Sequence, residues 1–86
     1  DAIGDLKEIY DYISQDSISA ASRFANSLLD RVDVLQNFPK SGRIVPEFGD
    51  QSIRELIKGN YRIVYHLVSN KEINILRIHH AASQLQ

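Results

Sequence analysis

The spacing of apolar residues changes from helical to strand-like partway along this 86-residue chain, and that change limits the fold more than any other feature. Up to about residue 37, apolar side chains recur at steps of three and four residues, as in amphipathic helices. From residue 53 onward they recur at every second position, as in half-buried strands. Helices followed by strands within one short chain predict a single α+β domain over residues 1–86.

Two helices are predicted in the first part of the chain. The first covers residues 2–14, where acids separate the members of an apolar stripe formed by Ile3, Leu6, Ile9, Tyr10 and Ile13. Ser17 or Ser19 can cap the second helix, which we expect to end near Asn37 because Pro39 cannot lie inside a helix. Residues 39–46 mix proline, glycine and serine with charges and predict a loop. The two helices therefore form an antiparallel pair.

Three antiparallel strands are predicted after the loop, and we expect the complete sheet to have three to four strands. Gly59-Asn60 suits a tight turn that needs a positive φ, and residues 69–72 form a second polar turn before a strand over 73–79. The helix pair must cover one face of this sheet, which leaves the other face partly exposed to water.

The pairing of the last two strands has two possible registers. A hairpin closed on Asn70-Lys71 pairs Ile63 with Ile78, pairs Tyr65 with Leu76 and places Arg62 opposite His79. A three-residue loop instead places Arg62 opposite His80. Packing of apolar residues favours the first register.

Composition excludes several classes of protein. The net charge of −1 provides no generally basic surface, so any contact with nucleic acid must be local. No apolar run approaches the length of a membrane span, and the chain has no cysteine. No spacing of histidines and acids supplies three convergent metal ligands, and no phosphate-binding loop is present. We expect a cytoplasmic protein without a metal or another cofactor.

Residues able to act on a phosphodiester gather in the loop, the strands and the C-terminal end. Cleavage of RNA needs a base, an acid and fixed cations that stabilise charge on the phosphate. We assign Glu47 as the base, His80 or His79 as the acid and Arg62 as the clamp on the scissile phosphate. Further phosphate contacts are assigned to Arg43, Arg54, Lys58 and Arg77. Equally, such cations on a wet sheet face can serve only solubility and cross-strand pairing, and Glu55 can pair with one of them.

Three segments carry a family resemblance: residues 38–48, which include Val45-Pro46-Glu47, residues 54–65, which include Arg62-Ile63-Val64-Tyr65, and residues 77–82. Over nearly its whole length the chain resembles the RelE/ParE toxins of bacterial type II toxin–antitoxin systems, the plasmid-stabilisation type. Members usually begin with a strand before the first helix. We expect either that such a segment is missing from the chain or that the sheet edge is left open.

The resemblance implies roles for individual residues. In RelE-type mRNA interferases that have these segments in the same order, the arginine matching Arg62 holds phosphate. A histidine eighteen positions onward, here His80, assists proton transfer. Glu47 resembles the proline-flanked glutamate that acts as base in some of these enzymes. Ala81 stands where those enzymes often place a tyrosine, and Ser83 stands where many relatives carry arginine.

The resemblance leaves two functions open, both of which arrest growth. One is a metal-independent endoribonuclease that cuts mRNA on the ribosome, which Glu47, Arg62 and His80 favour narrowly because together they provide base, clamp and acid. The other is a ParE-type toxin that binds and inhibits DNA gyrase without catalysis. An inactive remnant is a third possibility. Each toxin type implies a cognate antitoxin, which would form a hetero-oligomer with the chain.

Overall fold

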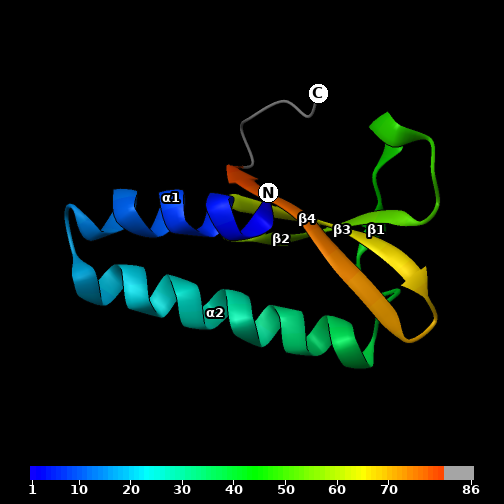
Figure 1. Ribbon diagram of the computed structural model, residues 1–86, viewed down its shortest axis with the longest axis horizontal. Helices are drawn as coiled ribbons and strands as arrows, with labels where there is room; N and C mark the ends of the chain where they lie inside the picture. The colour runs from blue at the N-terminus through cyan, green and yellow to red at the C-terminus, as the bar shows by residue number, and fades with distance from the viewer. Residues whose placement is uncertain (81–86) are drawn as a thin grey trace.

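Two helices precede a four-stranded sheet in the computed structural model, which describes residues 1–80 (Figure 1). The α+β prediction is confirmed. The helices are α1 (Ala2–Ser14) and α2 (Ile18–Asn37), followed by the strands and a short 3₁₀ turn: β1 (Arg43–Ile44), η1 (Pro46–Phe48), β2 (Ile53–Lys58), β3 (Tyr61–Ser69) and β4 (Glu72–His80). Ala81 and Ser83, which depart from the family pattern, lie outside the described residues.

Local sequence signals account for the helix ends. The Asp1 carboxylate accepts a hydrogen bond from the Gly4 N–H at 2.7 Å, and the Ser17 hydroxyl accepts one from the Ala20 N–H at 3.0 Å. Ser17 rather than Ser19 is therefore the cap of α2. The predicted end of α2 at Asn37 is confirmed. Among residues 1–80, no helix is both long enough and apolar enough to cross a lipid bilayer.

The strands form an antiparallel sheet in the order β1-β2-β3-β4. The two-residue strand β1 arises within the segment predicted as loop, where Arg43 and Ile44 pair with Glu55 and Arg54. Gly59 takes the predicted positive φ, 58°, at the turn between β2 and β3. The second hairpin leads from β3 into β4 across Asn70-Lys71.

The register of β3 and β4 follows the Asn70-Lys71 prediction only in part. Ile63 pairs with Ile78 and Arg62 with His79, as predicted. The predicted pairing of Tyr65 with Leu76 is wrong, because the register shifts between Val64 and Tyr65 and Tyr65 pairs with Ile75. A shift of this kind inserts one extra residue into one strand, which in this ladder is Leu76.

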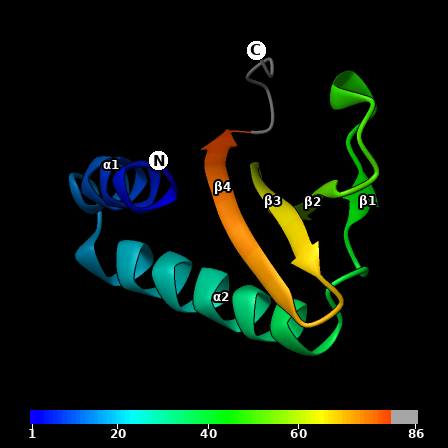
Figure 2. The same ribbon diagram turned by 45° about the vertical axis from the view of Figure 1, so that its right-hand side comes forward.

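The helices cover one face and one edge of the sheet. Leu28 of α2 packs with Ile63 and Ile78, and partly buried residues surround this cluster: Leu6, Ile9, Phe24, Leu56 and Ile75. In Figure 2, α1 lies beside β4 while α2 runs below the sheet. Because neighbouring strand residues point to opposite faces, Arg62 and His79 lie on the face away from this core.

Candidate ion-pair network and cleft

An ion-pair network of four side chains occupies the sheet face away from the helices. The Arg43 Nε lies 2.8 Å from Oε2 of Glu55, and the Arg62 Nε lies 2.5 Å from Oε1 of the same carboxylate. Arg62 also reaches Glu47 of η1, with 3.5 Å between Nη2 and Oε2. The network thus links β1, β2, β3 and η1, and it alternates positive and negative charge. We refer to Arg43, Glu55, Arg62 and Glu47 as the ion-pair network.

Exposure differs sharply along the ion-pair network. The Glu55 side chain is 0% exposed and that of Arg62 is 12% exposed, whereas Glu47 is 50% and Arg43 67% exposed. Burial alone raises the pKa of Glu55, but hydrogen bonds from Arg62 and Arg43 and their charges outweigh burial and hold that pKa below its ordinary value. The bond to Glu55 likewise raises the pKa of Arg62. The inner pair is therefore fully charged at neutral pH.

The two histidines lie on different faces of β4. His79 is paired with Arg62 in the ladder, and its Nε2 is buried without a hydrogen-bond partner in the described part of the chain. Burial and then the charges of Arg62 and Arg77 lower the pKa of His79. His80 is paired with Tyr61, and the two rings meet edge to face with centroids 5.5 Å apart. The structure therefore brings His79, and not His80, to the side of the sheet that carries Arg62 and Glu47.

Besides Arg43, two more of the cations assigned to phosphate have partners within the protein. The Arg54 Nη1 donates to the carbonyl oxygens of Lys40 and Gly42 at 3.2 Å and 3.0 Å, which ties the segment after α2 to the sheet. The Arg77 guanidinium donates to both oxygens of Asp5. Lys58, at the end of β2, has no ion-pair partner within residues 1–80.

Sequence reasoning did not identify Asp5 as a partner and left the role of Glu55 open. Glu55 shares one face of its strand with Ile53 and Ile57, and this position between two apolar residues was a signal that its carboxylate could be buried. No such signal pointed to Asp5, because it lies 72 positions from Arg77. Within residues 1–80 no group of three histidines and acids could hold a metal ion.

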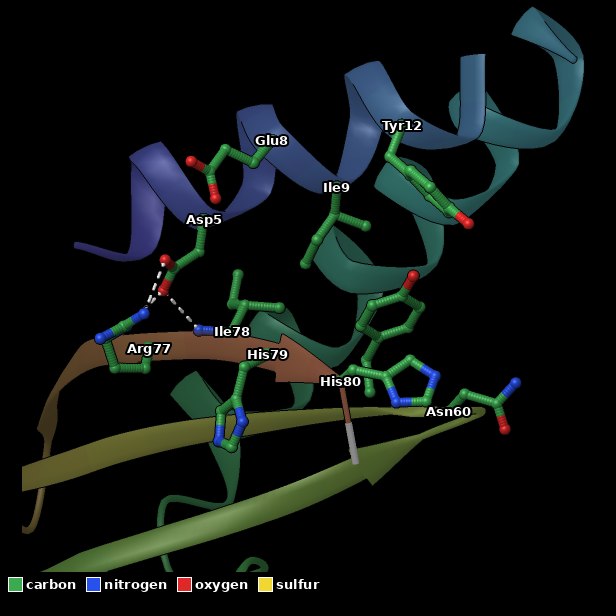
Figure 3. Close-up of a pocket in the computed structure, with 10 residues that line it drawn as sticks. Asp5, Glu8, Ile9, Tyr12, Asn60, Arg77, Ile78, His79 and His80 are labelled. Atoms are coloured by element: carbon green, nitrogen blue, oxygen red, sulfur yellow. Dashed lines mark hydrogen bonds and ion pairs between the residues drawn. The ribbon is translucent and has the colours of Figure 1, made fainter. Parts of the chain in front are cut away.

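A cleft of about 580 Å³ lies between α1 and the C-terminal end of β4 (Figure 3). Figure 3 shows Asp5 reaching down from α1 to Arg77, with Ile9 and Tyr12 further along the same helix. His80 lies beside Asn60 at the other end of this cleft. Among the described residues that line the cleft, the arginine is Arg77, and Asp5 neutralises its charge.

Two comparisons with known proteins identify what the chain is similar to. Residues 1–85 match the family model described as the ParE toxin of the type II toxin–antitoxin system, parDE. The chain is also similar to Toxin RelE2 of Caulobacter vibrioides (strain ATCC 19089 / CIP 103742 / CB 15), with 36% identity over 81 residues. That alignment covers 94% of this chain and 88% of the relative.

Proposed function

The chain belongs to the RelE/ParE family of type II toxins, and we propose that it arrests growth by binding its target in the ParE manner rather than by cleaving RNA. Membership in a toxin–antitoxin family implies a cognate antitoxin as partner. The target that we propose is DNA gyrase, which the ParE type inhibits without catalysis, and the site of action is then the cytoplasm.

One observation carries this proposal: the buried carboxylate of Glu55 already accepts hydrogen bonds from the Nε of both Arg62 and Arg43, and Glu47 adds a second negative charge beside Arg62. The ion-pair network has two positive and two negative charges and is neutral as a whole. A polyanion such as RNA is attracted by unneutralised cations, and its affinity rises with the number of phosphates that they contact. The face that was expected to hold the scissile phosphate has no excess of positive charge in its ion-pair network.

The histidines support the same conclusion. A general acid must carry a proton at the operating pH, and its pKa must therefore lie near that pH. The pKa of His79 is lowered from its ordinary value of 6.5, so its imidazole is neutral at pH 7. His80, the acid that the family resemblance favours, stacks edge-on against Tyr61 on the other face of the sheet from Arg62.

The decisive experiment compares two consequences of expression in one culture. The chain is induced in cells that lack an antitoxin, and plasmid superhelicity and the integrity of an abundant mRNA are followed together. We expect loss of negative supercoiling while the message stays full length, and inhibition of purified gyrase by the purified protein. Uninduced cells are the control. Early cuts in the message with unchanged supercoiling would contradict the proposal.

A second candidate, metal-independent RNA cleavage, is favoured by the proximity of Glu47, Arg62 and His79 on one face. In that case Glu47 or neutral His79 takes the 2′-hydroxyl proton, and the 2′-oxygen displaces the 5′-oxygen from the phosphate that Arg62 holds. The same proton then passes from the base to the departing 5′-oxygen, which leaves a 2′,3′-cyclic phosphate. His79→Asn should then abolish cleavage while His80→Asn keeps it, and cleavage should persist in the presence of a chelator. Intact message in cells arrested by the wild-type chain would exclude this candidate.

A further inference from the structure

The two carboxylate contacts of the Arg62 guanidinium are unequal. Its Nε lies 2.5 Å from the buried Glu55, whereas its Nη2 lies 3.5 Å from Glu47, whose side chain is half exposed. The backbone of η1 is held by its own bonds, from the Phe48 N–H to Val45 and from the Gly49 N–H to Pro46. The Glu47 side chain can therefore turn away from Arg62 without movement of the sheet.

This inequality prepares Arg62 for an external ligand. Glu55 holds the guanidinium in one orientation, so a ligand does not have to order it, and the planar fork of arginine suits an oxyanion. An exposed ion pair at the distance of Glu47 contributes little to stability, because water competes with it. Arg43 donates its Nε–H to Glu55 and is largely exposed, and its two Nη atoms form no hydrogen bond or ion pair within the described residues.

We propose that Glu47 is an internal ligand of Arg62 that an acidic side chain of a partner protein replaces. Once Glu47 turns away, Arg43, Arg62 and Glu55 together carry one net positive charge. One carboxylate neutralises this charge, whereas a run of phosphates would exceed it. The site already accommodates a carboxylate in the form of Glu47. This proposal deepens the proposed binding function, but its test needs neither gyrase nor an antitoxin.

The test is an NMR titration of the Arg62 Nε–Hε resonance in the whole chain. The first probe is a capped glutamate, N-acetylglutamate α-amide, and the second is dimethyl phosphate, a phosphodiester of the same charge. We expect saturable shifts with the capped glutamate and a Kd that is about three- to fivefold lower in Glu47→Gln. Glu72→Gln, which removes the same charge at the exposed start of β4, should change the Kd less than about twofold.

Three results would overturn the proposal. One is a Kd for the capped glutamate that is equal in the wild type and in Glu47→Gln, or that falls as much in Glu72→Gln as in Glu47→Gln. Another is the absence of saturable shifts with the capped glutamate in both proteins. The third is tighter binding of dimethyl phosphate than of the capped glutamate, which would assign the site to phosphodiesters. Arg62→Lys keeps the charge but loses the planar fork and the Nε–Hε group, so its titration is followed through the backbone amide resonance of residue 62. In this background Glu47→Gln should no longer lower the Kd for the capped glutamate. Supercoiling assays decide the proposed function independently of this outcome.

Discussion

Asp5 and Arg77 lie 72 positions apart and form a two-point ion pair, with 2.8 Å between Nε and Oδ2 and 3.2 Å between Nη2 and Oδ1. The same carboxylate accepts the backbone N–H of Ile78 at 2.9 Å. A helical side chain thus satisfies a donor of β4, which stands at the end of the sheet order. Asp5 thereby fastens α1 to the sheet.

Asp5→Ala should destabilise the protein more than Arg77→Ala does. Loss of the carboxylate leaves the buried Ile78 N–H without its acceptor, which costs about 1–3 kcal/mol in the free energy of unfolding. Arg77→Ala leaves the Asp5 carboxylate, whose side chain is 10% exposed, with the Ile78 N–H still donating to it, so we expect the smaller loss for this variant. Urea unfolding of both variants measures the difference. An equal loss in the two variants would show that the Ile78 hydrogen bond contributes nothing.

Glu55→Ala should be far more damaging than Glu47→Ala, although both remove a carboxylate partner of Arg62. Loss of the buried Glu55 leaves Arg62 as a nearly buried charge with one distant partner, which costs about 3–5 kcal/mol. Loss of the half-exposed Glu47 should cost less than about 1 kcal/mol. Thermal and urea unfolding test the ranking, and similar losses would mean that the buried carboxylate does not hold the network together.

Tyr65→Phe should loosen the segment that follows α2. The buried Tyr65 hydroxyl accepts the Gly42 N–H at 2.9 Å and donates to the Pro39 carbonyl at 2.6 Å. Its removal leaves the Gly42 N–H without a partner and should cost about 1–3 kcal/mol. Tyr12→Phe changes an exposed ring and is the matched control, expected to lie within about 0.5 kcal/mol of wild type. Hydrogen exchange at Gly42 should accelerate only in Tyr65→Phe.

Acid should destabilise the protein through Glu55 and Asp5. For each carboxyl group burial raises the pKa, but hydrogen bonds and charges from the arginines have a larger effect, so the pKa lies below its ordinary value. For Asp5 the hydrogen bond from the Ile78 N–H also lowers the pKa. Because the pKa is lower in the folded state, each carboxylate stabilises the fold fully above its ordinary pKa, which is 4.5 for Glu55 and 3.8 for Asp5. This stabilisation is lost as the pH falls through the folded-state pKa. Unfolding midpoints between pH 6 and pH 2 measure this, and a flat profile would contradict it.

His79 should titrate below its ordinary pKa of 6.5 because its ring is partly buried and faces the charges of Arg62 and Arg77. Since the unfolded chain then takes up a proton more readily than the folded protein, His79 should reduce stability as the pH falls from about 6.5 toward the folded-state pKa. An NMR titration of the imidazole gives the folded value. His79→Asn should flatten the stability profile in that range, and a titration above 6.5 would refute the expectation.

Local patterns explain why much of the fold was predictable. The two helices, the Ser17 cap and the turn at Gly59 each depend on residues only a few positions apart, and the structure shows all of them. The predicted stripe of the first helix is confirmed only in part, because Ile3 is 82% exposed. The Ile63–Ile78 pairing followed from matching two alternating strands across a short turn. The Tyr65–Leu76 pairing failed because the extra residue in β4 leaves no mark in the alternation that sequence reasoning uses.

The grouping of cations near the hairpin was visible in the sequence, but their partners were not. Each arginine could bind an external phosphate, pair across strands or contact a carbonyl, and the same residue type suits all three. Arg54 bonds to carbonyl oxygens, Arg77 to Asp5 and Arg62 to a buried glutamate. Which partner each arginine contacts depends on distances between segments that are far apart along the chain.

Short-range order alone was enough to specify two amphipathic helices, a meander of strands and a toxin-like family pattern, because periodicity and turn chemistry act between near neighbours. Tertiary packing decided which histidine shares a face with Arg62 and that Glu55 holds two guanidinium groups. The physical reason is that burial and Coulomb attraction depend on which segments lie close together in space. Strand register and its shifts between β3 and β4 decide this for the residues of the sheet.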